Sequence, residues 1–261
     1  MTVSSIDVQS YPRNATRWAG IIVSLAAFTF TAIFFTHFVL FLGNLPEFSN
    51  PWVAPTVDIG GTSHPALAAM IDIGLIALFG LQHSLMARPR FKAWWTRTVP
   101  EGLERSTYVI AASSAGFIML VFWQPIPITL WDGHGTVAAI FWTLFVAGWL
   151  LLLVSALSFD IFELLGIRQS LAWSHGNPPP APELKTRGAY RLMRHPMYLG
   201  VMFGLWMTPL MTVGHALLAA SFTVYIVIAR RYEERDLRSR FGAQYAEAEE
   251  QDESVQISVT I

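Results

Sequence analysis

The chain has 261 residues, of which 53% are hydrophobic and only 13% are charged, about half the charged fraction of a typical soluble domain. This composition indicates a protein that uses the lipid bilayer as its solvent. The formal net charge of -1 argues against nucleic-acid binding, which needs a basic face. The absence of cysteine excludes disulfides, thiolate metal ligands and cysteine nucleophiles, and no metal site is predicted.

We expect residues 1–261 to form a single membrane domain, an all-α polytopic bundle. A membrane-spanning helix needs roughly 20 mostly apolar residues. After a polar N-terminal segment over residues 1–17, four such helices are predicted within residues 18–165. They cover 18–42, 66–86, 107–126, and 137–157 with a tail to residue 165.

Two shorter apolar stretches follow a polar loop, at residues 195–212 and 214–228. Pro209, Thr212 and Gly214 mark the turn between them. The sequence therefore predicts a short helical hairpin as the last two of six membrane segments. Residues 246–261 are acidic and then polar, which predicts a flexible tail.

Basic residues alternate between loops, which tests this topology through the positive-inside rule. Two lie before the first predicted helix, five after the second, five after the fourth and five after the sixth, which accounts for all 17 Lys and Arg. Six segments with both termini in the cytoplasm place all of them on one side. The alternative of five spans, with the hairpin fused into one helix, would place the last five outside, so we prefer six.

Polar residues from distant parts of the sequence fall at the predicted cytoplasmic ends of the helices. Ionisable groups at this depth are energetically costly, so they usually pair or serve a function. A polar pocket that faces the cytoplasm is therefore predicted. Structural alternatives remain open, because Asp160 and Arg168 could form an ion pair that only stabilises the fold, and His83 could be a packing residue. The members of this layer are Gln82, His83, Asp160, Glu163, Arg168, Arg194, His195, Tyr198, Arg231, Glu233 and Glu234.

The most informative stretch is 187–200, which contains the pattern G-x-Y-x-x-x-R-H-P-x-Y-x-G from Gly188 to Gly200. Glu233 and Glu234 follow, and then Phe241, Gly242 and Tyr245. Together these blocks resemble the signature of the isoprenylcysteine carboxyl methyltransferase superfamily of integral membrane methyltransferases. The blocks 82–89, 104–108 and 162–169 further resemble its methanethiol S-methyltransferase and NnrU-like branch.

The resemblance implies a pocket for S-adenosyl-L-methionine within a core over residues 166–245. Pro196 suits the first turn of a helix, because its missing N–H would have no partner there. The free amides of that turn could hold an anionic group of the cofactor. The residues that the resemblance assigns to the cofactor are Tyr190, Arg194, His195, Tyr198, Gly200, Glu233 and Glu234.

The expected reaction is methylation of a small thiol, with methanethiol converted to dimethyl sulfide, in a bacterial cytoplasmic membrane with the site facing the cytoplasm. The acceptor and membrane lipid are the expected partners. Candidates for catalysis at the right depth are Asp160, Glu163, His83 and Arg168, the first three as general bases. Two alternatives remain open: a methyltransferase for a prenylcysteine carboxylate or a lipid amine, and a non-enzymatic NnrU-like membrane protein.

Overall fold

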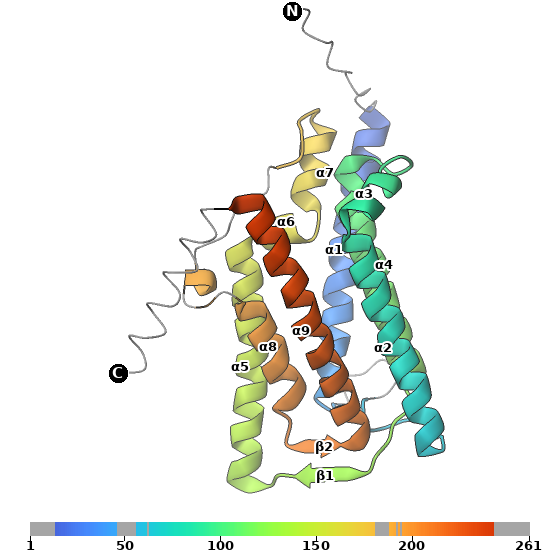
Figure 1. Cartoon of the computed structure of the whole chain (residues 1–261), viewed down its shortest axis with the longest axis vertical. Coiled ribbons are helices and arrows are strands. Elements are labelled where there is room, and N and C mark those ends of the chain that lie inside the picture. The colour runs from blue at the N-terminus through green and yellow to red at the C-terminus, as the bar shows by residue number, and fades with distance from the viewer. Residues whose placement is uncertain are drawn as a thin grey trace, which may run out of the picture.

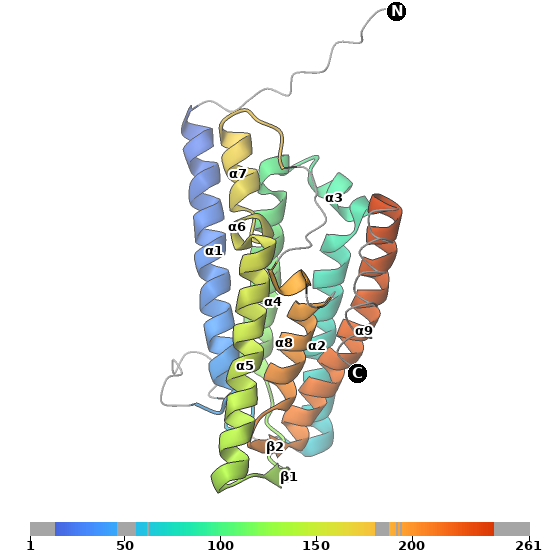
Figure 2. The same ribbon diagram turned by 90° about the vertical axis from the view of Figure 1, so that its left-hand side faces the viewer.

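The computed structural model describes residues 14–45, 56–61, 63–180, 188–191, 193 and 195–242. In this part of the chain, long helices lie side by side in an elongated bundle (Figures 1 and 2). The helices are α1 (Asn14–Leu42), α2 (Pro65–Ala87), α3 (Pro89–Trp95), α4 (Glu101–Phe122), α5 (Gly135–Phe159), α6 (Ile161–Leu164), α7 (Ile167–Ser174), the 3-10 turn η2 (Gly188–Arg191), α8 (Pro196–Trp206) and α9 (Val213–Phe241).

Five of the described helices are long and apolar enough to cross a membrane: α1, α2, α4, α5 and α9. The prediction of a polytopic helical membrane protein, with four spanning helices before the polar loop, is confirmed. The short helix α8 has only 11 residues, about half the length that a span needs.

The second arm of the predicted hairpin is longer than expected. Instead of ending near residue 228, α9 continues for 29 residues to Phe241. The apolar stretch ends at Arg230, but the helix does not, because Arg230 donates a hydrogen bond to Glu234 one turn later and such pairs stabilise an exposed helix. The prediction of a short second arm was therefore wrong. The predicted tail over residues 246–261 lies outside the described residues.

A two-stranded antiparallel sheet closes one end of the bundle. Strand β1 (Thr129–Asp132) pairs with β2 (Leu210–Thr212), with Trp131 opposite Met211. The all-α prediction missed this sheet, because segments of three and four residues are too short to show an alternating pattern. The sheet brings together two loops that lack Lys and Arg, and we refer to this end of the bundle as the non-basic end (Figure 1).

The opposite end of the bundle, which we call the basic end, carries α3, α6, α7 and the end of α9 (Figures 1 and 2). Aromatic and aliphatic side chains form the main core nearer the non-basic end, among them Phe38, Trp123 and Leu218. Large apolar residues such as Met70 and Leu150 are more than half exposed on the outer faces of α2 and α5. A lipid solvent accounts for this arrangement, because acyl chains are as apolar as these side chains.

Helix α8 packs very closely on α5 through glycines. A Cβ at Gly200 would lie 2.7 Å from both the carbonyl oxygen of Gly148 and the amide nitrogen of Leu152. Small residues of this kind allow two helix backbones to approach each other. Gly200, expected at the cofactor, thus faces α5, and its contact fixes the position of the residues that begin α8.

Gly200→Ala is expected to destabilise the protein by about 1–3 kcal/mol, the usual penalty for overpacking. Gly74→Ala is the matched control, because it also lies in a helix and its Cβ would meet no atom within 4 Å. The measurement is thermal unfolding in detergent. Equal melting temperatures for the two variants would show that the contact between α5 and α8 is not tight.

Candidate active site

A cavity of about 870 Å³ lies between α2, α4, α8 and α9, within the size range of small-molecule sites. Its lining is apolar on the exposed flanks of α2 and α9, where Leu81 and Val224 lie. The polar residues that line it are His83, Ser84, Arg88, Arg105, Tyr108, Tyr198, Ser221, Tyr225, Tyr232, Glu233 and Asp236.

One wall is built where α8 begins against α9. The Tyr198 hydroxyl donates a hydrogen bond to Glu233 Oε2 at 2.5 Å. His195 Nε2 lies 3.1 Å from Glu234 Oε1, the oxygen that also accepts from Arg230 Nε at 2.8 Å. We refer to Tyr198, Glu233, His195 and Glu234 as the carboxylate wall. Neighbouring carboxylates of α9 thus bind different residues of the α8 start.

The sequence prediction placed all four of these residues at one site, and the structure brings them together. Tyr198 and Glu233 line the cavity. The His195 ring stacks on Tyr198 with centroids 5.4 Å apart and planes 23° apart, so it supports the lining from outside. The Tyr190 ring in η2 lies with its centroid 6.2 Å from that of Phe159 at the end of α5, and burial, together with the charge of Glu233, raises its pKa. Arg194 lies outside the described residues.

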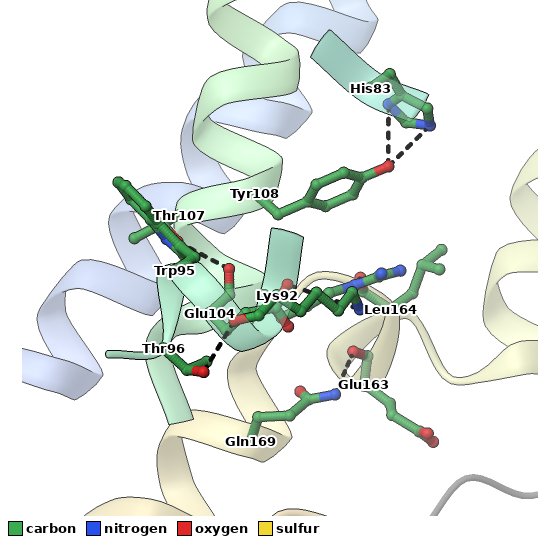
Figure 3. A network of polar contacts seen from close by, with 11 residues as sticks. His83, Lys92, Trp95, Thr96, Glu104, Thr107, Tyr108, Glu163, Leu164 and Gln169 are labelled. Carbon is green, nitrogen blue, oxygen red and sulfur yellow. Dashed lines mark hydrogen bonds and ion pairs between the residues drawn. The ribbon is translucent and has the colours of Figure 1, made fainter. Parts of the chain in front are cut away.

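The opposite wall joins α2 to α4 (Figure 3). The Tyr108 hydroxyl lies 2.9 Å from Nε2 and 3.1 Å from Nδ1 of His83. The guanidinium carbon of Arg105 lies 5.2 Å from the centre of the Tyr108 ring, and its Nε donates to the Leu164 carbonyl at 2.7 Å. We refer to His83, Tyr108 and Arg105 as the histidine wall. It carries a basic imidazole, a hydroxyl and a permanent cation.

Asp160, Glu163 and Arg168 do not line the cavity. Asp160 has a positive φ of 86°, and its carboxylate caps α6 by accepting from the Phe162 and Glu163 amides. It also forms an ion pair with Arg168. In Figure 3 the Glu163 side chain points away from His83 and Tyr108. The structure therefore places these three predicted residues at the basic end of the bundle, as expected, but not at the cavity.

The bonds of Asp160 determine how its stability contribution varies with pH. Burial opposes its charge, but the Glu163 amide and Arg168 outweigh it and hold the pKa below its ordinary value of 3.8. A carboxyl whose folded-state pKa is depressed stabilises the fold above its unfolded pKa and loses this effect as the pH falls through the folded pKa.

Asp160→Ala is therefore expected to lower stability by about 1 kcal/mol at neutral pH, the usual loss for a helix cap. The difference from the parent should shrink in acid below the folded pKa. Thermal unfolding at neutral and acid pH measures both effects, with Asp132→Ala at an exposed site as control. A difference that persisted in acid would contradict the role of the charge.

Several cavity residues were not assigned to the site by the sequence analysis. Tyr225, Tyr232 and Asp236 line the cavity from α9, and their spacing of seven and four residues places them on one helix face. That spacing is a signal that the sequence contained. Arg88 lies 4.3 Å from the centre of the Tyr232 ring. The tyrosine rings and carboxylates suit a cationic organic group, whereas Arg88 and Arg105 suit an anionic one.

Comparison with known proteins identifies the family. Residues 142–244 match the phospholipid methyltransferase family. The methanethiol S-methyltransferase of Crocosphaera subtropica is 41% identical over 208 residues, 78% of each chain. That of Pseudomonas deceptionensis is 39% identical over 236 residues, 90% of this chain and 87% of its own. This chain belongs to the methanethiol S-methyltransferase family.

The resemblance seen in the sequence motifs is thus confirmed for most of the chain. Human nurim is also similar, at 34% identity over 220 residues, 78% of this chain and 81% of nurim. No solved structure matches. The phospholipid methyltransferase match contains the carboxylate wall but begins after the histidine wall, which lies between residues 83 and 108.

Proposed function

We propose that this membrane protein transfers the methyl group of S-adenosylmethionine to methanethiol and releases dimethyl sulfide. The observation that carries the proposal is the identity with named methanethiol S-methyltransferases over most of the chain. The cavity between α2, α4, α8 and α9 is the proposed site. It is large enough for a small-molecule ligand and lined by groups of both charge signs.

The residues present fit this cofactor. S-adenosylmethionine carries a sulfonium and an ammonium, which suit tyrosine faces and carboxylates. Its hydroxyls suit Glu233, whose carboxylate lines the cavity beside the Tyr198 hydroxyl. Its carboxylate suits a guanidinium, which can bind it through two parallel hydrogen bonds, and Arg88 lines the cavity nearby.

The carboxylate wall is therefore assigned to the cofactor. Glu233 is the proposed direct ligand, with Tyr198 fixing the orientation of its carboxylate. Glu234 and His195 act from behind the lining and hold α9 and the first turn of α8 in register. Tyr190 and Arg194 are assigned to the same side from the family motif.

When bound, S-adenosylmethionine supplies an electrophilic methyl group on a positively charged sulfur. The protein must hold the acceptor sulfur in line with that methyl group, and positioning of this kind provides much of the acceleration. A thiol attacks as the thiolate, and the reference thiol pKa of cysteine is about 8.5. The site must therefore favour the anion, and the Arg105 cation that lines the cavity does so.

Transfer assays with radiolabelled cofactor and three acceptors test the proposal. Detergent-purified protein is given methanethiol, a prenylcysteine or a phospholipid amine. The amine is the second candidate acceptor because of the phospholipid methyltransferase match. We expect label in the volatile product of methanethiol alone. Label in the lipid would reassign the acceptor, and cofactor binding without any transfer would favour a non-enzymatic role.

We also propose that the basic end of the bundle faces the cytoplasm of a bacterial membrane, because Lys and Arg are concentrated in loops on that side. The chain contains no cysteine, so single substitutions can report the topology. Asp132→Cys in β1 should react with an impermeant maleimide on intact spheroplasts. Ser239→Cys near the end of α9 should react only after permeabilisation. The reverse pattern would overturn the orientation.

A further inference from the structure

We propose that the histidine wall is the acceptor subsite, where the thiol proton passes through the Tyr108 hydroxyl to His83 while the sulfur is methylated. This inference rests on the proposed thiol methylation and assigns its proton transfer to residues that lie opposite the carboxylate wall. The assignment follows from hydrogen-bond geometry, charge distribution and the extent of the family match.

The hydrogen bonding of this wall suits a proton relay. The side chains of both His83 and Tyr108 line the cavity, and the hydroxyl lies within 3.1 Å of each ring nitrogen. A phenolic hydroxyl both donates and accepts, and a neutral imidazole accepts at one ring nitrogen. A thiol bound at the hydroxyl can therefore give its proton to the Tyr108 oxygen as the hydroxyl proton moves to His83.

The charges of the two walls are opposite. Arg105 lies over the Tyr108 ring, and within the described part of the chain no carboxylate lies at ion-pair distance from its guanidinium. The adjacent Glu104 is paired with Lys92 at 3.6 Å (Figure 3). The carboxylate wall instead presents Glu233 to the cavity. A positive wall stabilises a thiolate and a negative wall stabilises a sulfonium, which are the two charges that the reaction brings together.

The other base candidates lack access to the acceptor. The Asp160 carboxylate already accepts hydrogen bonds from two backbone amides and pairs with Arg168. Neither Asp160 nor Glu163 lines the cavity. The family match supplies an independent argument. A machinery shared with phospholipid methyltransferases is expected to bind the common cofactor, and it covers residues 142–244. His83 and Tyr108 lie outside that range, where groups specific for the acceptor are expected.

The reaction is balanced without a further reactant. The thiol S–H bond breaks and one proton reaches His83. One carbon–sulfur bond forms at the acceptor, and one breaks at the methyl donor, where the electron pair stays on sulfur. The imidazolium then returns its proton to water, so that the site is restored for the next turnover.

Two acceptors of similar size and different acidity separate this role from simple packing. Ethanethiol is mostly protonated at neutral pH, whereas 2,2,2-trifluoroethanethiol is a much stronger acid because fluorine withdraws electrons. Tyr108→Phe and His83→Gln should lower kcat/KM for ethanethiol by about 100-fold or more, the usual size of a general-base effect. For the fluorinated thiol, the loss should be less than about tenfold, because the thiolate fraction no longer limits the rate.

Tyr225→Phe is the matched control, since it also removes a tyrosine hydroxyl from the cavity lining, one that interacts with Ser84 rather than His83. This variant should change kcat/KM for both thiols by the same factor. Calorimetric binding of S-adenosylmethionine and the melting temperature establish that each variant is folded. Equal losses for the two thiols in the Tyr108 and His83 variants would overturn the relay, whereas a folded parent that fails to methylate methanethiol in the same assay would refute the proposed function itself.

Discussion

Replacing Glu233 by Gln is expected to weaken S-adenosylmethionine binding by about 10- to 100-fold. The substitution keeps the shape of the side chain but removes the charge that lines the cavity beside Tyr198. Hydrogen bonds to charged groups contribute about 1.5–3 kcal/mol, and each 1.4 kcal/mol is roughly tenfold in affinity. Isothermal titration in detergent measures the change directly.

Glu101→Gln is the control for this prediction. Glu101 also lies on a helix near the basic end but is exposed and does not line the cavity. Its loss should leave cofactor affinity unchanged. If Glu233→Gln bound the cofactor as tightly as the parent, the carboxylate wall would not be the cofactor site. The assignment of the thiol to the histidine wall would then lose the support it takes from a cofactor on the opposite wall.

Replacing His195 by Ala is expected to lower kcat/KM for methanethiol by about 100-fold, although His195 lies outside the cavity lining. The variant removes the ring that stacks on Tyr198 and the partner of Glu234. Glu234 keeps its ion pair with Arg230, so α9 should remain helical. The start of α8, however, loses the contact that holds it in place against α9. Misplacement of a reacting group by about 1 Å can cost this much.

The exposed His175 at the end of α7 provides the control, and His175→Ala should retain parental kinetics. Turnover is followed by headspace analysis of the methylated product, alongside the melting temperature of each variant. A His195→Ala protein with full activity would show that the His195–Glu234 bond does not position the site.

The sequence predicted the carboxylate wall because two blocks of one motif lie on adjacent helices. The pattern around His195 and Tyr198 begins α8, and the pair Glu233 and Glu234 lies on α9. An antiparallel arrangement of these helices brings the two blocks together without any further fold information. For this reason, the family motif predicts that these residues share one site, whereas the pairing of each carboxylate with its partner is seen only in the structure.

Asp160 and Arg168 show where sequence reasoning stops. Hydropathy and loop charge give the position of a residue along the membrane normal, and by that measure both lie at the basic end. Hydropathy and loop charge do not show which way a side chain points around the helix axis. The structure shows that Asp160 is directed at its own turn, as cap and ion-pair partner, and not at the cavity.

The histidine wall was predicted only in part, for a related reason. His83 was a candidate through its depth, but Tyr108 is distant in sequence and the hydrogen bond between them depends on how α2 packs on α4. A single sequence does not contain that packing angle. The strands β1 and β2 were missed because their pairing joins residues about 80 positions apart, with no local pattern to announce it.

Gas chromatography with mass detection of the headspace over purified protein tests the central claim most directly. The protein is supplied with methanethiol and with S-adenosylmethionine that carries a deuterated methyl group. We predict dimethyl sulfide that contains one deuterated methyl group from the parent, and a large loss of this product from His195→Ala. The absence of labelled dimethyl sulfide from a folded parent that binds the cofactor would contradict the proposed methylation of methanethiol.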